Sequence, residues 1–198
     1  IDPVRYISNN SSGKMGYALA EAAVQEGAVV NLVSGPVVLT ADKSINLFKI
    51  NSASEMLEAV NTCMKSSDIF ISCAAVADYK PSKYSDTKIK KENLDNLEIN
   101  LEKNHDILSE VAEQFSSAYI VGFAAETSDV NANAKKKLDS KNLNMIISND
   151  VSDSSIGFDS DENEVHVITG SETIFIKKDK KIRIAREILN IISTNINS

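Results

Sequence analysis

Three segments of this chain are almost continuously apolar and then end in small or polar residues. They are DIFISCAAVADY at 68–79, AYIVGFAAET at 118–127 and LNMIISND at 143–150. Strands with one solvated face alternate apolar and polar residues, whereas continuous apolarity is typical of parallel strands covered on both faces. Helical spacing precedes the first segment at 56–64 and separates it from the second at 107–115. We therefore predict an α/β fold with a doubly wound, mostly parallel sheet.

The remaining elements complete this sheet. Residues 163–178 alternate on both sides of Gly170-Ser171, which predicts an antiparallel hairpin at the sheet edge. Helices are expected at 15–26, 129–142 and 184–192, and short strands at 28–36, 44–51 and 97–101. No repeat or low-complexity linker divides the 198 residues, so we expect a single domain over 1–198.

Residues 80–96 have no apolar period and predict a mobile loop. The loop is rich in lysine: Lys80, Lys83, Lys88, Lys90 and Lys91. A loop of this kind can close over a polyphosphate, although a solvated loop is the more common use of such a composition. Because carboxyl ends of parallel strands meet at one sheet edge, the polar segments after 68–76, 118–126 and 143–150 should converge on one crevice.

Charge and composition exclude several classes of protein. A net charge of -7 argues against a general role on nucleic acid or a membrane surface. No apolar run approaches the ~18 residues of a membrane-spanning helix, and the first residues lack the features of a signal peptide. Cys63 and Cys73 lie within apolar patterns, as expected for buried thiols of a cytoplasmic protein rather than for a disulfide.

A possible phosphate loop precedes the first helix. Its residues are Ser11, Ser12, Gly13, Lys14, Met15 and Gly16. Glycine allows a close backbone approach, and the amides that begin a helix attract anions. The segment matches neither the Walker A pattern nor G-x-G-x-x-G, and an ordinary capped helix start is the alternative interpretation.

Four other polar residues are candidates. Asn9 can donate a hydrogen bond to a developing oxyanion, or it can form an ordinary turn before the helix. Asp78 follows a predicted strand and can bind ribose, bind a metal or cap a turn. Lys137 and Lys141 share one helix face, an arrangement that costs stability unless an anion or acceptor lies opposite.

Five separated motifs resemble one family, phosphopantothenate–cysteine ligase. They are DPVRYISNNSSGKMG, AAVADYKP followed by KIKK, VGFAAET, KNLNMIISNDVS and GFDSDENEV, in consistent order along the chain. The resemblance implies a Rossmann-like fold and a cytoplasmic homodimer that joins 4′-phosphopantothenate to cysteine with CTP and Mg²⁺. The expected intermediate is an acyl-cytidylate, and the reaction needs positioning and charge neutralisation more than a protein nucleophile.

The resemblance also implies individual roles. Asn9, Arg5 and Lys88 match residues that act on the acyl-cytidylate and on phosphate charge, Lys88 within a flexible lid. Asp78 matches an acidic contact to nucleotide or metal. The nucleotide-lining residues are matched by Ser11 to Gly16 and by Ser72, Cys73, Ala74, His105, Asp106, Ile107, Leu108, Phe123, Lys137 and Lys141, the two lysines being expected to contact cytosine.

This sequence departs from the family pattern at two places. His105 stands where the nucleotide-lining turn usually opens with proline. The family also has a strand and a Gly-rich turn before the segment that begins here with IDPV, so a first strand is expected to be missing. In bifunctional members a flavin-dependent decarboxylase lies further upstream, and without it we expect neither FMN nor decarboxylation.

Two other classes remain as alternatives. A dinucleotide-binding oxidoreductase domain requires G-x-G-x-x-G and an acidic residue after the second strand, where this chain has Val33-Ser34-Gly35-Pro36. A non-catalytic nucleotide-binding module has the same fold but no need of Asn9 for turnover.

Overall fold

The computed structural model describes residues 1–90, 96–126, 130–150 and 160–197. The helices are α1 (Lys14–Gln25), α2 (Ala53–Met64), α3 (Ile107–Gln114), α4 (Val130–Ser140) and α5 (Lys181–Ile196). The strands are β1 (Asn31–Ser34), β2 (Asn46–Lys49), β3 (Ile69–Ser72), β4 (Tyr79–Pro81), β5 (Leu101–Lys103), β6 (Tyr119–Glu126), β7 (Met145–Asp150), β8 (Glu162–Thr169) and β9 (Thr173–Lys180).

The main sheet has the strand order β3-β6-β7-β8-β9. β3, β6 and β7 run parallel, whereas β8 and β9 add an antiparallel hairpin beside β7. The predicted α/β class, the mostly parallel sheet and the C-terminal hairpin are therefore confirmed. β1 and β2 pair in parallel but form a separate two-stranded sheet, which the prediction of one sheet did not anticipate.

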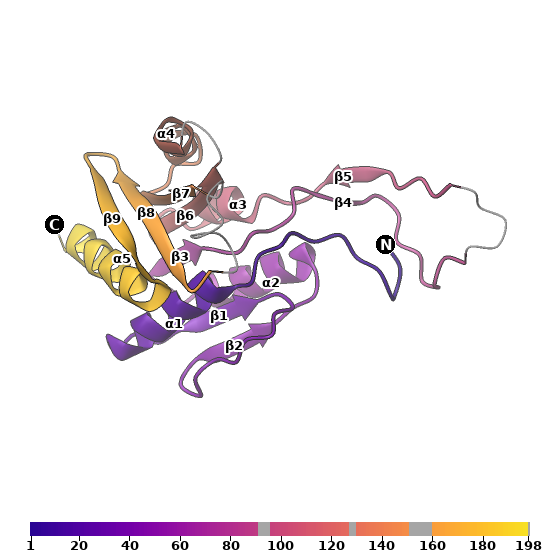
Figure 1. Ribbon diagram of the computed structural model, residues 1–198, viewed down its shortest axis with the longest axis horizontal. Coiled ribbons are helices and arrows are strands. Elements are labelled where there is room, and N and C mark those ends of the chain that lie inside the picture. The colour runs from indigo at the N-terminus through magenta and orange to yellow at the C-terminus, as the bar shows by residue number, and fades with distance from the viewer. Residues whose placement is uncertain (91–95, 127–129, 151–159, 198) are drawn as a thin grey trace.

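Side chains of the central strands alternate between two apolar layers. Ile120 and Ile146 face a cluster with α2, α3 and α4, whereas Val121 and Met145 face a cluster with α1 and α5. Figure 1 shows α1 and α5 on one side of the sheet and α3 and α4 on the other. Because each face needs its own apolar set, the continuous apolarity of these strands follows from their burial on both sides.

Local rules explain where the helices begin. Ser52 accepts a hydrogen bond from the Glu55 amide at 3.2 Å, and the Glu55 carboxylate accepts from the Asn51 amide at 2.9 Å. This reciprocal arrangement is a capping box that starts α2. Asp106 starts α3 in a similar way, through the Ser109 amide at 3.1 Å. In α1 the N-cap is Gly13, with φ of 77° and no side-chain cap.

The segment predicted as an unstructured loop is partly ordered. β4 pairs with β5 in antiparallel fashion, Tyr79 opposite Lys103, so the strand expected at 97–101 begins at Leu101 instead. β5 is exposed throughout, whereas β4 has one exposed and two partly buried residues, and a ribbon without a fully buried face has no apolar pattern imposed on it. We call residues 79–90 and 96–103 the arm; Figure 1 shows it extending away from the helices and the main sheet. Lys91 and the rest of 91–95 lie outside the described residues, as does 151–159.

Gly122 in β6 sits where the sheet meets α3. A Cβ at this position would lie 2.9 Å from Leu108 and 3.0 Å from Leu143. We expect Gly122→Ala to lower the free energy of unfolding by about 1–3 kcal/mol, because the added methyl group would overpack the core against Leu108 and Leu143. Urea denaturation measures the change.

Gly170 provides the control for this substitution. Within the described part of the chain, no atom beyond the adjacent residues lies within 4 Å of a Cβ placed on Gly170, in the turn of the hairpin. Gly170→Ala should therefore leave stability nearly unchanged, and equal losses in the two variants would contradict the packing argument.

Candidate nucleotide site

Hydrogen bonds connect Asn9 to the end of β3. The Asn9 side-chain amide donates to the Ala75 carbonyl, and its oxygen accepts from the Ser11 amide at 3.1 Å. Ala75 lies just beyond the predicted nucleotide-lining residues Ser72, which ends β3, Cys73 and Ala74. Asn9 thus holds the predicted phosphate loop against the predicted nucleotide-lining backbone.

Cys73 packs close to the start of α1. A Cβ on Gly16 would lie 4.0 Å from the Cβ of Cys73, so the two backbones approach closely there. Burial raises the pKa of the Cys73 thiol to about 12. The thiol is therefore protonated at neutral pH and is not a nucleophile, in keeping with a contribution through the backbone. Cys63 is also free, as expected.

Asn104 links the next two predicted segments. Its backbone amide donates to the Asp78 carbonyl at 2.8 Å, and its side chain donates to the Ala77 carbonyl at 3.0 Å. Asp78 itself is exposed. Asn104 was not among the predicted site residues, since an asparagine within the mostly polar segment LEKNHD carries no distinguishing signal.

The turn that begins α3 is joined to the end of α4. Lys141 donates to Asp106 at 2.6 Å, and His105 contacts Glu110 at 2.9 Å. Burial works to raise the pKa of Asp106, but hydrogen bonds from Lys141 and Ser109 outweigh it and lower the pKa. Asp106 thus provides an acceptor for Lys141, just beyond the end of α4. Lys137, one turn earlier, is exposed.

The apolar members of the predicted site belong mainly to the core. Ile107 is buried, and Leu108 packs against the same cluster as α2 and α4. Phe123 is partly buried against the cluster of α1 and α5. Ile107 could therefore meet a ligand only through its backbone, whereas the side chain of Leu108 is partly exposed.

Lys14 and Lys88 have separate surroundings. Lys14 pairs with the exposed Asp161 at 2.7 Å, and this ammonium group holds the pKa of Asp161 below its usual range.

Lys88 is exposed on the arm, and no contact in the described ranges joins it to the strand ends. Arg5 reaches the arm instead, where it donates to the Ile89 carbonyl at 3.2 Å. Asp2, which also holds Arg5, was missed although it lies in a quoted motif.

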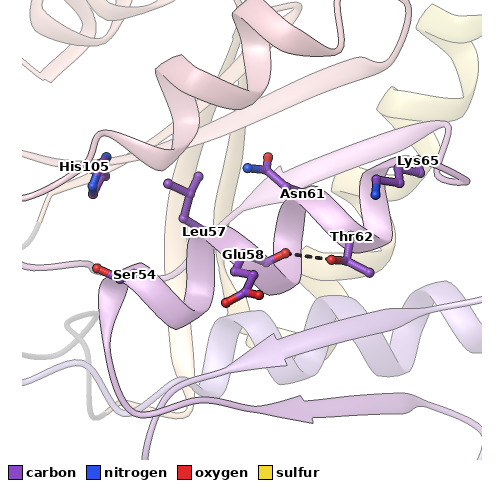
Figure 2. Close-up of a pocket in the computed structure, with 7 residues that line it drawn as sticks. All are labelled: Ser54, Leu57, Glu58, Asn61, Thr62, Lys65 and His105. Carbon is purple, nitrogen blue, oxygen red and sulfur yellow. Dashed lines mark hydrogen bonds between the residues drawn. The ribbon is translucent and has the colours of Figure 1, made fainter.

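Two surface hollows lie near these groups. One, of about 340 Å³, runs along α2 and is lined by Ser54, Leu57, Glu58, Asn61, Thr62, Lys65 and His105 (Figure 2). The other, of about 310 Å³, includes Lys14, Asp161 and Lys181. Each contains one predicted site residue. The segments after β6 and β7 lie outside the described residues, so convergence on a single crevice stays a prediction.

Asp106 offers a direct test of this geometry. Asp106→Ala removes the cap of α3 and the partner of Lys141, and we expect the free energy of unfolding to fall by about 1 kcal/mol. Asp106→Asn keeps a capping side chain and should cost less. Urea denaturation of both variants and the wild type at pH 7 measures the two effects.

The same variants have a defined pH dependence. Because folding lowers the pKa of Asp106, its stabilisation is present above the usual aspartate pKa of about 3.9 and is lost as pH falls through the lowered value. The difference between the wild type and Asp106→Asn should therefore shrink at pH 3. A difference that stays constant would show that the charge of Asp106 contributes nothing.

Comparisons with known proteins agree with the motifs. The family described as DNA/pantothenate metabolism flavoprotein C-terminal domain matches residues 1–196. The chain is 45% identical over 196 residues to coenzyme A biosynthesis bifunctional protein CoaBC of Vibrio vulnificus (strain YJ016), covering 98% of this chain and 49% of that protein. It is 44% identical over 197 residues to CoaBC of Escherichia coli (strain K12), covering 98% and 48%. The chain thus spans about half the length of these curated relatives.

Solved structures show the same fold. The crystal structure of the C-terminal domain of CoaBC superposes with a TM-score of 0.83 at 40% identity, covering all of this chain and 89% of the other. A Cab2 mutant in complex with phosphopantothenate-cysteine gives a TM-score of 0.78 at 17% identity, covering 98% and 82%. At that identity the second match supports the fold alone.

Proposed function

Because the chain belongs to the DNA/pantothenate metabolism flavoprotein C-terminal domain family, we propose that it is a ligase of coenzyme A biosynthesis. It joins 4′-phosphopantothenate to L-cysteine with CTP, giving 4′-phosphopantothenoylcysteine, CMP and pyrophosphate. The observation that carries this proposal is a set of three hydrogen-bonded links, of Asn9 to Ala75, of Asn104 to Ala77 and Asp78, and of Lys141 to Asp106. They join segments to which the resemblance assigns nucleotide binding.

The proposed reaction proceeds in two displacements. The carboxylate oxygen of 4′-phosphopantothenate attacks the α-phosphorus of CTP, and the bond to pyrophosphate breaks. The amine of cysteine then attacks the acyl carbon, loses a proton and expels CMP. Both steps need alignment and neutralised charge, which amides and lysines provide without a protein nucleophile.

Each segment has a role in this scheme. The start of α1 follows Gly13, which has no side chain to cap the helix, and the amides that begin a helix attract phosphate oxygens. Asn9 donates to the oxyanion that forms when cysteine attacks. Arg5 and Lys88 neutralise phosphate charge, and Lys137 and Lys141 face the base. Lys14 can exchange the exposed carboxylate of Asp161 for a phosphate oxygen.

The site suits a magnesium ion that binds together with the phosphates of the nucleotide. The described residues contain no group of three or more side chains able to hold a metal ion. Mg²⁺ is commonly bound by one or two carboxylates together with substrate phosphates, and Asp78 is the carboxylate proposed here. The ion would neutralise charge on the triphosphate.

The proposed compartment is the cytoplasm. The free thiols of Cys63 and Cys73 fit a reducing environment. Among the described residues, none of the helices combines the length and apolarity needed to cross a membrane.

The decisive test is substrate dependence. We expect pyrophosphate release from CTP only when 4′-phosphopantothenate is present, because its carboxylate is the attacking group. A pyrophosphate assay with Mg²⁺, omitting each substrate in turn, measures this. Equal release without 4′-phosphopantothenate, or none in any mixture, would overturn the proposal; CTP binding without turnover would indicate a non-catalytic module.

Asn9→Asp serves as the variant in the same assay. It should still form acyl-cytidylate but transfer it poorly to cysteine, since a carboxylate cannot donate to the oxyanion. Asn10→Asp is the matched control, because it adds the same charge at the neighbouring exposed position. Normal ligation by Asn9→Asp would remove Asn9 from the mechanism.

We also propose that two copies associate through the arm. The arm exposes a set of large apolar side chains: Tyr79, Tyr84, Leu97, Ile99 and Leu101. Such a set on a projecting ribbon is typical of a surface that a partner covers, and family resemblance favours a second copy. Homodimer interfaces are richer in apolar area than other surfaces.

Leu101→Asp should weaken this dimer. A charge placed in an apolar interface has to be desolvated, so we expect a shift toward monomer in sedimentation velocity. Val29→Asp is the control, because Val29 is apolar and exposed but distant in sequence from the arm. A sedimentation coefficient that is the same for Leu101→Asp and the wild type would exclude the arm as the interface.

A further inference from the structure

A buried carboxylate near the start of the chain gathers five donors. The Asp2 side chain is fully buried, and its Oδ1 accepts from the backbone amides of Val4 at 2.9 Å and Arg5 at 3.0 Å. Its Oδ2 accepts from the Ile89 amide at 3.1 Å and from Nε of Arg5 at 3.1 Å. Nη2 of Arg5 also donates to Oδ2. Burying a charge without hydrogen-bond partners is costly in free energy. The five hydrogen bonds to Asp2 offset this cost and fix the carboxylate in one position.

The carboxylate in turn fixes Arg5. Nε and Nη2 of the guanidinium both donate to Asp2 Oδ2, and these two hydrogen bonds set the plane of the group. The described residues provide no partner for Nη1, and the side chain is 41% exposed. Arg5 therefore presents a pre-oriented, charged donor to solvent.

Asp2 and Arg5 together hold the backbone of one residue of the arm, Ile89, through its N–H and its C=O. Asp2 accepts from the amide of Ile89, and Arg5 donates to the carbonyl of the same residue at 3.2 Å. A further hydrogen bond, from the Ser85 amide to the Ile1 carbonyl at 3.1 Å, docks the arm nearby. Lys88 is the residue directly before Ile89. We call Asp2, Arg5 and the backbone N–H and C=O of Ile89 the clamp.

We propose that Asp2 is a positioning residue for the ligase reaction, acting through the clamp to orient Arg5 and to hold Lys88 beside the segment that carries Asn9. This inference rests on the proposed function, since Arg5 and Lys88 act on phosphate only if that reaction occurs. The clamp itself is a property of the fold and can be observed without turnover. The Arg5 guanidinium holds the pKa of Asp2 well below its usual range, so the clamp stays charged through neutral pH.

The test replaces Asp2 by asparagine, which keeps the size but supplies an N–H where Oδ2 accepted. We expect protection of the Ile89 amide against hydrogen exchange to fall at least tenfold. We expect kcat for pyrophosphate release to fall about 100-fold with less than a threefold change in the KM for CTP, because misplacing a charged group by about 1 Å costs on that order. Asp86→Asn, an exposed carboxylate on the same arm, should change neither quantity more than twofold.

A mutant cycle separates positioning from general destabilisation. If Asp2 acts through Arg5 and Lys88, adding Asp2→Asn to the variant with both Arg5→Met and Lys88→Met should lower kcat less than twofold further. Additive losses, or normal turnover by Asp2→Asn, would overturn the proposal. If Asp2→Asn does not fold, Asp2→Glu keeps the charge, shifts the carboxylate and should give the same two losses. A wild type without turnover refutes the proposed function, whereas unchanged Ile89 exchange in the variant refutes the clamp.

Discussion

The burial of β6 and β7 on both faces is the constraint on which the rest of the structure depends. Ile120 and Ile146 contact one helical layer while Val121 and Met145 contact the other, so a one-residue slip would exchange the two sets. This fixed register places the carboxyl ends of β3, β6 and β7 at a common edge. The polar segments at this edge therefore start from strand ends whose positions are set by the two buried layers.

Polar contacts then connect the segments that leave the sheet. The linkage from Asn9 through Ala75, Asn104 and Asp78 joins stretches far apart in sequence. Most of its acceptors are backbone carbonyls, so loop positions are set by main-chain geometry. Such an arrangement suits a reaction that depends on alignment rather than on a strongly activated side chain.

The fold could be predicted where one physical rule dominated. Two-sided burial produced the apolar runs of β3, β6 and β7, and alternation about Gly170-Ser171 produced the hairpin. The β4–β5 ribbon was not predicted as such, because its exposed faces impose no pattern. The separation of β1 and β2 from the main sheet is likewise invisible in apolar spacing, which reports burial but not strand neighbours.

The candidate site was predicted mainly through motifs, and its contacts were only partly foreseeable. The ion pair of Lys141 with Asp106 joins two residues that the motifs had assigned to the nucleotide separately. Asp2 and Asn104 were missed because their importance comes from backbone groups of residues distant in sequence, Ile89 for Asp2 and Ala77 for Asn104. Residue type alone gives no indication of such partners.

Because the clamp binds the backbone N–H and C=O of Ile89 and not its side chain, docking of the arm does not depend on which amino acid stands there, except that proline has no N–H to donate. Substitutions can accumulate along 85–90 without releasing the arm from the N-terminal segment. Sequence differences between relatives in this stretch therefore do not indicate whether their arms dock. A replacement of Asp2 would indicate it, because it removes the acceptor for both Ile89 and Arg5.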